Sequence, residues 1–380
     1  MTQLPIYTEE HEMFRRTIRD FVANEVTPFV NEWDEAEEFP RDLYQKVGAL
    51  GLFGIGFDEQ YGGLGHHDAI LLCIVSEEFG RCGAGGVAAS LFSNYIAAPP
   101  IQIGGSEELR AEILPGTLSG DLISALAITE PGGGSDVARL TTTATRDGEH
   151  YVVNGQKTYI TSGLRADYIT TAVRTGGPGA AGVSLLVIPT NLPGFSATPL
   201  NKMGWWCSDT ATLYFDDCRV PVGNLLGAEN AGFRLIMENF NYERLQMISG
   251  VVGASRVCFD EALAWARERE TFGARLADHQ VIRHKLVEMD RQINATRAWM
   301  EQLAWRIDQG DKPVAELAEC KVQATLTMEF CAREAAQILG GASYIRGNPV
   351  ERIYREVRVN AIGGGSEEIM RDLAARQLGI

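Results

Sequence analysis

Residues 127–136 read Ala-Ile-Thr-Glu-Pro-Gly-Gly-Gly-Ser-Asp and follow an apolar run, Leu-Ile-Ser-Ala-Leu, at 122–126. An apolar run that ends in glycines and small polar residues is typical of a strand leading into a binding loop, because glycine lets the backbone approach a ligand closely. The loop departs from the dinucleotide-binding fingerprint, since Val137 stands where the third glycine belongs, and it lacks the Gly-Lys-Ser/Thr of a P-loop. The stretch is therefore predicted to be either a ligand loop of another kind or a plain turn between two strands.

The composition is that of a globular protein with more than one packed unit. The chain has 380 residues, 45% hydrophobic and 22% charged, which is enough for about two or three cores. Its net charge of −16 opposes binding to nucleic-acid phosphates. No apolar run reaches the about 20 residues of a membrane span, and the start at 1–5 lacks the basic-then-apolar pattern of a signal peptide. We expect a cytoplasmic protein that binds no nucleic acid and has no integral membrane segment.

The cysteines and histidines give no sign of a metal site. The seven cysteines are scattered, and no two form a Cys-x-x-Cys pair. His66 and His67 are adjacent, so their side chains diverge, and no further ligand stands beside them at helical spacing. The sequence predicts reduced, partly buried cysteines and no metal.

Helical periodicity covers the two ends of the chain. The N-terminal part, 1–122, begins with a helix that Thr8 can cap. The glycine-dense stretch at 61–65 is predicted to be a loop. The C-terminal part, 229–380, is rich in Ala, Leu, Glu and Arg and is predicted to be a bundle of long helices. The first three of these are expected at about 232–269, 280–310 and 314–340.

The middle part, 123–228, changes to an alternating pattern with frequent turn signals and is predicted to be a β-domain. Asn154-Gly155 is typical of the tight turn of a hairpin. Further strands are expected at 168–174, 183–189 and 210–215. The fold class is α+β, with an N-terminal helical domain, a central β-barrel-like domain and a C-terminal helical bundle.

The stretch 129–136 resembles the Thr-Glu-Pro-Gly-x-Gly-Ser-Asp signature of the acyl-CoA dehydrogenases, and further motifs of that family follow in order down to the C-terminus. The resemblance implies that family's fold, an FAD cofactor, and an acyl-CoA thioester oxidised between Cα and Cβ to the trans-2-enoyl product. It also implies a homotetramer or homodimer that passes electrons to an electron-transferring flavoprotein. In the N-terminal part it implies a pair of helices after the loop at 61–65, at about 68–80 and 86–103.

The same resemblance implies which residues hold FAD. Tyr159 and Thr161 stand where the family places an aromatic and a hydroxyl against the flavin, although an aromatic in a strand often simply packs. The motifs around Arg269 and Gly340 resemble segments that reach FAD across a subunit boundary. Glu368 departs from the Gln usual in the family. The implied set is Ile128, Thr129, Gly134, Ser135, Tyr159, Thr161, Arg269, Phe272, Gln280, Gln337, Gly340, Gly341, Ser366 and Glu368.

The catalytic base is expected on a helix. Many family members carry it as Glu in a loop near the C-terminus, where this chain has Gly364. The isovaleryl-type and long-chain-type branches carry it on the first helix of the C-terminal domain, where this chain reads Asn-Tyr-Glu-Arg-Leu at 241–245. The resemblance therefore implies Glu243 as the base, on one helical face with Ile236, Phe240, Met247 and Gly250. The alternative is a buried Glu satisfied by Arg244 or a backbone donor.

The thioester is expected to contact Ser135, Tyr242, Arg244, Gly364 and Gly365. Missing side chains at Gly363 and Gly364 favour a branched or bulky acyl group, such as a terpenoid one. Besides the dehydrogenase, two functions stay open: an acyl-CoA oxidase or flavin monooxygenase of the same fold, and a non-catalytic flavoprotein that serves as a binding module. The retained Glu243 argues against a monooxygenase, which needs no Cα base, and against a module without any base.

Overall fold

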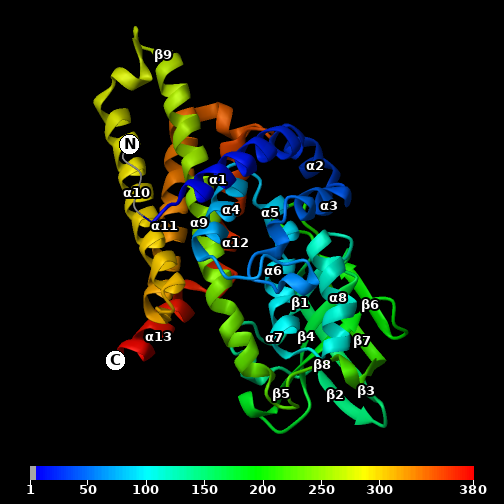
Figure 1. Cartoon of the computed structure of the whole chain (residues 1–380). Coiled ribbons are helices and arrows are strands. Elements are labelled where there is room, and N and C mark those ends of the chain that lie inside the picture. Colours follow the sequence, from blue (N-terminus) through cyan, green and yellow to red (C-terminus); the bar gives the residue numbers. More distant parts are fainter. Residues whose placement is uncertain (1–5) are drawn as a thin grey trace.

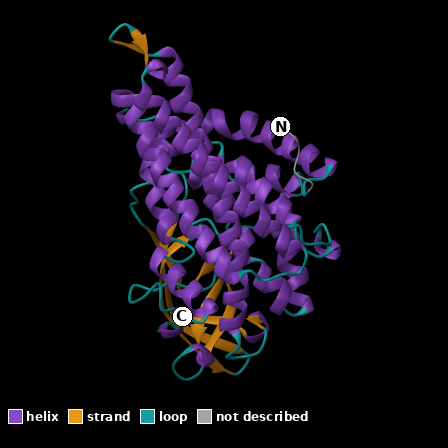
Figure 2. Cartoon of the chain, turned by 90° about the vertical axis from the view of Figure 1, so that its left-hand side faces the viewer, coloured by secondary structure: helices purple, strands orange, loops and turns teal. Residues whose placement is uncertain are grey.

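A computed structural model describes residues 6–380, arranged as helices, then strands, then helices (Figures 1 and 2). The opening segment 1–5, where the sequence predicts no signal peptide, lies outside the described residues. The N-terminal helices are α1 (Glu9–Phe21), α2 (Val30–Ala36), α3 (Asp42–Ala49), α4 (Ala69–Gly80), α5 (Gly85–Leu91), α6 (Asn94–Ala97), α7 (Pro99–Gly104) and α8 (Glu107–Ser119). The middle strands are β1 (Ser124–Ala127), β2 (Thr143–Asp147), β3 (His150–Thr161), β4 (Tyr168–Arg174), β5 (Val183–Pro189), β6 (Phe195–Pro199), β7 (Thr210–Pro221) and β8 (Leu225–Leu226). The C-terminal elements are α9 (Gly232–Glu268), β9 (Glu270–Thr271), β10 (Ala274–Arg275), α10 (Gln280–Asp308), α11 (Val314–Leu339), α12 (Pro349–Ile362) and α13 (Glu367–Leu378).

Two of the predicted N-terminal helices are confirmed and one is wrong. Thr8 caps α1, because its side chain accepts a 3.1 Å hydrogen bond from the His11 amide. Asp68 caps α4 in the same way. The single helix expected at 86–103 is instead broken into α5, α6 and α7. Pro99 begins α7, where a proline fits, but in a continuous helix its ring would clash with the preceding turn.

The middle strands form an eight-stranded mixed sheet within the described chain. Its order is β6-β7-β3-β2-β4-β5-β8, with β1 parallel to β4, so the ladder runs from β6 to β8 without closing into a ring. The strands expected at 168–174 and 183–189 are confirmed as β4 and β5. The hairpin expected at Asn154-Gly155 is wrong, because β3 runs straight through both residues.

Gly148 and Gly155 explain that error. The turn between β2 and β3 lies at Gly148, with φ of 60°. Gly155, with φ of 141°, instead forms an irregularity in the pairing of β3 with β7. A Cβ at Gly155 would lie 2.7 Å from the Cα of Thr142, so glycine serves close packing there.

The helix α9 is placed by its crossing with α4. Every residue of α4 from Ala69 to Phe79 is buried, so α4 forms the centre of the helical core. The two helices touch through glycines: a Cβ at Gly80 would lie 2.2 Å from the Gly250 carbonyl oxygen, and one at Gly253 would lie 2.2 Å from that of Glu77. Any side chain at Gly80 or Gly253 would push α9 away from α4 and from the rest of the N-terminal domain.

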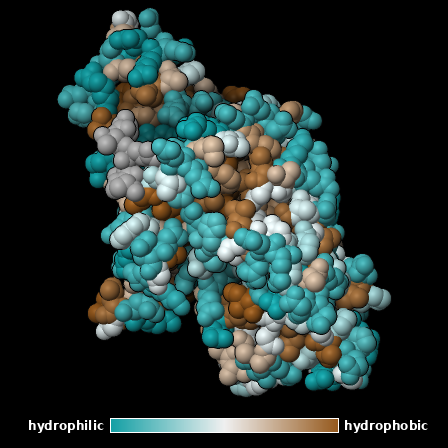
Figure 3. Space-filling view, in the orientation of Figure 1, coloured by the Kyte–Doolittle hydropathy of each residue, from teal (hydrophilic) through white to brown (hydrophobic). Residues whose placement is uncertain are grey.

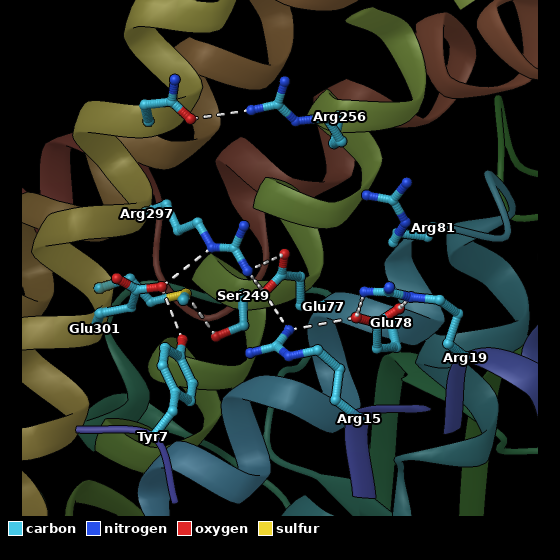
Figure 4. A network of polar contacts seen from close by, with 12 residues as sticks. Tyr7, Arg15, Arg19, Glu77, Glu78, Arg81, Ser249, Arg256, Arg297 and Glu301 are labelled. Carbon is cyan, nitrogen blue, oxygen red and sulfur yellow. Dashed lines mark hydrogen bonds and ion pairs between the residues drawn. The ribbon is translucent and has the colours of Figure 1, made fainter. Parts of the chain in front are cut away.

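A buried ionic network holds the first helix against the rest of the molecule (Figure 4). Arg15 on α1 lies 3.2 Å from Glu77 and 3.3 Å from Glu78, both on α4. Arg297 on α10 reaches the same Glu77 at 3.0 Å. The network therefore joins the N-terminal domain to the C-terminal bundle, and each of its two carboxylates on α4 is shared by two arginines, because Arg19 also binds Glu78.

The surface in Figure 3 is mainly hydrophilic, with separate hydrophobic areas. Over residues 6–380 no helix combines the length and the apolar character needed to cross a bilayer. In the same part of the chain no group of three or more His, Cys, Asp or Glu side chains could hold a metal ion. All seven cysteines are buried and unpaired.

Candidate functional site

The loop that follows β1 is fixed at its base by a buried ion pair. Lys157 on β3 donates to the Ile128 carbonyl oxygen at 3.0 Å and to Glu130 at 2.8 Å. Glu130 also accepts from the backbone amides of Thr141 at 2.6 Å and Thr142 at 2.9 Å. Burial would raise the pKa of Glu130, but Lys157 and these hydrogen bonds lower it to about 2. Glu130 is therefore a permanent carboxylate that ties the loop to β3.

The tip of the loop is open to a ligand. No atom lies within 4 Å of a Cβ built at Gly132 or Gly133, and a cavity of about 210 Å³ lies beside both glycines. Gly134 and Ser135 are exposed, whereas Ile128 is buried and Thr129 is half-buried. The structure therefore supports the prediction that this stretch is a ligand loop rather than a packed turn.

Tyr159 stands next to this loop with its ring turned outward. The Thr158 amide donates to the Thr129 carbonyl oxygen at 3.0 Å, and Thr129 Oγ1 donates back to the Thr158 carbonyl oxygen at 2.5 Å. The following residue, Tyr159, has φ of 62° and a side chain 72% exposed. A left-handed backbone is uncommon for a bulky residue. Thr161 is half-buried two residues further along the same strand. The backbone is therefore strained at a position where a large aromatic ring faces outward. An exposed ring of this kind could pack against a planar ligand.

Glu243 is a half-buried residue of α9. Its Oε2 atom is buried and has no hydrogen-bond partner among residues 6–380. Burial raises the pKa of Glu243 to about 7, while the charges of Arg244 and Lys321 oppose the rise. The alternative of a core Glu satisfied by Arg244 is not supported, because Arg244 donates to Asn241 Oδ1 at 3.1 Å and to the Gly364 carbonyl oxygen at 3.3 Å. A buried carboxyl group without a partner is a candidate acid or base.

The glycine turn between α12 and α13 is held against Glu243 by two cations. Gly364 and Gly365 have φ of 65° and 109°, values that favour glycine. Arg244 on α9 binds the Gly364 carbonyl oxygen at 3.3 Å, and Lys321 on α11 binds that of Gly365 at 2.7 Å. The turn, which joins α12 to α13, is therefore bound by one residue of α9 and one residue of α11.

Gly364 lies beside the carboxyl group of Glu243. A Cβ built at Gly364 would lie 3.8 Å from Glu243 Oε1 and 2.6 Å from Met247 Sδ. A glutamate at position 364 would therefore start beside the carboxyl group of Glu243, but Met247 occupies the room that its side chain would need.

Tyr242 faces a different part of the molecule from its neighbour Glu243. It stacks on His67 with ring centroids 4.9 Å apart and helps to line a cavity of about 290 Å³ between the N-terminal domain and the loop before α11. Neither Glu243 nor Met247 lines this cavity. The structure thus places Arg244, Gly364 and Gly365 near Glu243, whereas Tyr242 faces the separate cavity with His67.

The remaining predicted FAD residues lie far from the loop of 128–136 within one chain. The helices α9, α10 and α11 run up, down and up in Figure 1, and the β9–β10 hairpin stands at the end opposite the sheet, as Figure 2 also shows. Phe272 at the hairpin tip is fully exposed, with φ of 52°. The predicted FAD residues at this end are all exposed: Arg269, Phe272, Gln280, Gln337, Gly340 and Gly341.

Ser366 and Glu368 follow the glycine turn. Ser366 caps α13, accepting from the Ile369 amide at 3.4 Å. Glu368 is exposed in the first turn of that helix, where the Glu368 amide and the Ser366 hydroxyl lower the pKa of its carboxyl group. Both residues therefore support their own helix, whatever else they contact.

Comparison with known proteins identifies the family to which this architecture belongs. Three family models match consecutive parts of the chain: the N-terminal domain of acyl-CoA dehydrogenases over residues 8–121, the middle domain over 125–218 and the C-terminal domain over 230–379. A helical, β and helical domain in this order, with an outward aromatic ring at a glycine-rich loop, defines a class of flavin-dependent oxidoreductases. The chain belongs to the acyl-CoA dehydrogenase family.

Individual relatives agree over nearly the whole chain. The mitochondrial long-chain specific acyl-CoA dehydrogenase of Sus scrofa is 36% identical over 377 residues, covering 98% of this chain and 87% of that protein. A crystal structure of a probable acyl-CoA dehydrogenase from Mycobacterium abscessus is 46% identical with a TM-score of 0.96, covering 98% of this chain and 100% of that one. The acyl-CoA dehydrogenase from Geobacillus kaustophilus is 36% identical with a TM-score of 0.95, each chain being covered to 100%.

FAD is the cofactor of this family, and the residues present fit it. The open space at Gly132 and Gly133 leaves room for a ligand against the backbone. The exposed ring of Tyr159 stands beside that space on β3, so it can lie against a flat ring system. The buried charges at the base of the loop, Glu130 and Lys157, neutralise each other at 2.8 Å, so this pair presents no net charge to a cofactor.

Sequence reasoning missed two buried cations of the site. Lys157 and Lys321 are both fully buried, although lysine is almost never buried without a partner. Lys321 lies in the stretch 318–324, which also contains Glu319 and Gln323, so a further polar residue there is ordinary and the sequence held no clear signal for it. Lys157 stands in an alternating strand beside Thr158, where a lysine is ordinary, so the sequence held no such signal for it.

Proposed function

We propose that this protein oxidises an acyl-CoA thioester between Cα and Cβ, with Glu243 as the base that takes the Cα proton. Bound FAD supplies the acceptor for the hydride that leaves Cβ. The observation that carries the proposal is the buried, unpartnered Oε2 of Glu243 beside the glycine turn. A buried carboxylate oxygen without a hydrogen-bond partner is a competent proton acceptor, because no hydrogen bond has to break before it accepts.

The pKa of Glu243 suits this task. With a pKa of about 7, raised by burial, the carboxyl group is about half ionised at neutral pH. A base works best when its pKa lies near the working pH, since it is then both present and strong enough. Arg244 keeps the neighbouring turn in place through the Gly364 carbonyl oxygen at 3.3 Å, rather than neutralising Glu243.

The other carboxylates near the site support the choice by contrast. Glu130 is ionised and occupied by Lys157, Thr141 and Thr142. Glu367 lies 3.0 Å from Arg371 and so is already paired. Glu368 is exposed at the start of α13 and not buried beside the turn. Glu243 is the acid among these whose proton-accepting atom is both buried and free.

We further propose a branched or bulky acyl group. Gly363 and Gly364 present no side chain to the space beside Glu243, and one face of that space is closed by Met247. Removing side-chain volume beside a reacting carbon favours substrates that carry a substituent there. The thioester is proposed to contact Ser135, Arg244, Gly364 and Gly365, with Tyr242 as a more distant contact.

The exposed residues at the hairpin end of the bundle support a shared cofactor site. Arg269 and Phe272 are exposed far from their own flavin loop, and a guanidinium suits the pyrophosphate of FAD. We propose that they contact the FAD of a neighbouring subunit in a homodimer or homotetramer, and that an electron-transferring flavoprotein reoxidises the enzyme.

Anaerobic titration with a panel of acyl-CoA thioesters tests the proposed reaction. Straight, branched and cyclic acyl groups are added in turn, and flavin absorbance near 450 nm is followed. Loss of that absorbance with a matching enoyl-CoA product is expected for at least one thioester. A protein that binds the thioesters but keeps its flavin absorbance across the panel is a binding module, and the proposal is then wrong. Reoxidation by air as fast as by electron-transferring flavoprotein would identify an oxidase instead.

A further inference from the structure

The turn at Gly363–Gly365 needs an outside anchor to hold one shape. Three glycines in sequence have more backbone freedom than any other tripeptide, and fixing them costs about 1–2 kcal/mol of conformational entropy per residue. Within the turn itself, the Gly363 amide donates to the Val359 carbonyl oxygen at 2.7 Å. The carbonyl groups of Gly364 and Gly365 are bound by Arg244 at 3.3 Å and by Lys321 at 2.7 Å.

Lys321 is the more buried of these two anchors. Its residue is 0% exposed, and the hydrogen bond from its Nζ to the Gly365 carbonyl oxygen is the contact that orients it. Burial lowers the pKa of Lys321 to about 8, while Glu367 and Glu243 oppose the fall and Arg244 adds to it. The ammonium is therefore still mostly charged at neutral pH, in the interior and near Glu243.

The charges around Glu243 come from three elements. Arg244 lies on its own helix, α9, and Lys321 lies on α11; both favour its ionised form. Glu367, at the start of α13, acts on Lys321 and is itself paired with Arg371 at 3.0 Å. Arg244 already serves two acceptors, Asn241 and Gly364.

We propose that Lys321 is a positioning residue of the active site: it holds the glycine turn against α9 and supplies the positive charge that favours the carboxylate form of Glu243. This inference rests on the proposed role of Glu243 as the base. Anchoring the turn requires a hydrogen-bond donor, whereas the effect on Glu243 requires a positive charge. Replacements that keep one of these properties and remove the other can therefore separate the two parts of the proposal.

Three replacements of Lys321 test the proposal. Lys321→Arg keeps the charge, Lys321→Gln keeps a donor for Gly365 without the charge, and Lys321→Met keeps neither at similar length. The rate of flavin reduction by a saturating acyl-CoA is measured from pH 5.5 to 9. Removing the charge in the Gln and Met variants should shift the midpoint of this profile upward by about one pH unit, because the carboxyl group of Glu243 becomes harder to ionise. The Arg variant should keep the parental midpoint.

Hydrogen exchange measures the anchoring separately from activity. Peptides covering residues 360–368 should exchange faster in Lys321→Met than in Lys321→Arg, with Lys321→Gln in between, because the Met variant leaves the Gly365 carbonyl without a donor and the shorter Gln side chain reaches it less well. Lys285→Met is the matched control: Lys285 is paired with Glu334 between α10 and α11. It should change neither the pH midpoint nor exchange at 360–368.

Each outcome decides between the proposals. Unchanged pH midpoints and unchanged exchange in Lys321→Gln and Lys321→Met would overturn the inference. The same shifts in Lys285→Met would show a general loss of packing and would also overturn it. If Glu243→Gln still reduces flavin at the parental rate, the proposed base is wrong, and faster exchange at 360–368 in Lys321→Met would then support the anchoring alone.

Discussion

Replacement of Glu243 by Gln removes a proton acceptor while keeping the size of the side chain and its place on α9. The variant should bind acyl-CoA with little change, since Glu243 Oε2 has no protein partner to lose among the described residues. Flavin reduction should slow by about two to four orders of magnitude, the usual contribution of a positioned general base. The parental rate should rise with pH to half its maximum near pH 7, whereas the residual rate of the variant should not follow this curve.

The same replacement should stabilise the fold at higher pH. Folding raises the pKa of Glu243 from 4.5 to about 7, a change of about 2.5 units, so its ionisation inside the fold costs about 3 kcal/mol. Because the folded pKa lies above the unfolded one, the parent is not penalised below pH 4.5 and loses stability as the pH rises toward 7. Gln stays neutral, so the variant should gain on the parent by up to about 3 kcal/mol between pH 5 and pH 8.

Rapid-mixing absorbance and urea unfolding at several pH values measure both effects. Glu268→Gln, an exposed position at the end of the same helix, is the control and should match the parent in both. Reduction by Glu243→Gln at near the parental rate would refute the base. A variant that loses FAD or unfolds at every pH would show that Glu243 supports the core rather than the reaction.

A glutamate at position 364 should restore part of the rate when Met247 is also shortened. The Cβ of Gly364→Glu would lie 3.8 Å from Glu243 Oε1 but only 2.6 Å from Met247 Sδ, and the positive φ of 65° adds strain of about 1–2 kcal/mol. In the Glu243→Gln background, Gly364→Glu with Met247→Ala should therefore recover more rate than Gly364→Glu alone. Equal recovery with and without Met247→Ala would show that Met247 does not occupy the space of the second base.

Three further predictions concern the cofactor, the fold and the substrate. Dilution should release FAD, and Arg269→Gln should release it at a higher protein concentration; size-exclusion chromatography with flavin absorbance would contradict this if a monomer retained its FAD. Lys157→Met should lower the free energy of unfolding by about 3–5 kcal/mol in denaturant titrations, because it leaves Glu130 buried without its cation. The parental pair stabilises above pH 4.5 and loses this contribution as the pH falls toward 2, so the difference between Lys157→Met and the parent should shrink in acid. Branched acyl-CoA thioesters should exceed straight short-chain ones in kcat/KM, and a preference of more than about tenfold for the straight chain would refute the role given to Gly363 and Gly364.

Local patterns predicted the regular elements well. The long helices expected at 232–269, 280–310 and 314–340 differ from α9, α10 and α11 by one or two residues at their ends, because an amphipathic repeat over many turns leaves little choice. The strands β4 and β5 were equally clear as apolar runs between turn signals. The hairpin predicted at Asn154-Gly155 was wrong, because β3 continues through this pair and its pairing with β7 outweighs the local preference for a turn.

The site itself was only partly predictable, because its geometry depends on contacts distant in sequence. Counting turns places Glu243 on the same face of α9 as Met247, but it does not reveal that Gly364, which is distant in sequence, lies beside Glu243. Nor does it reveal that Tyr242, the preceding residue, faces a separate cavity with His67.

The proposed position of the base would also explain the form of the turn. A base carried by a loop needs a residue whose side chain and backbone are both fixed there. If the base is Glu243, as proposed, it lies on α9, whose position is fixed by the close crossing with α4 at Gly80 and Gly253, and the turn then has to offer only backbone groups. Glycine can then take the positive φ values at 364 and 365 that direct two carbonyl groups to Arg244 and Lys321. The absence of a side chain at Gly364 and the two buried cations are therefore parts of one arrangement, in which rigidity comes from the helices and room for the substrate comes from the turn.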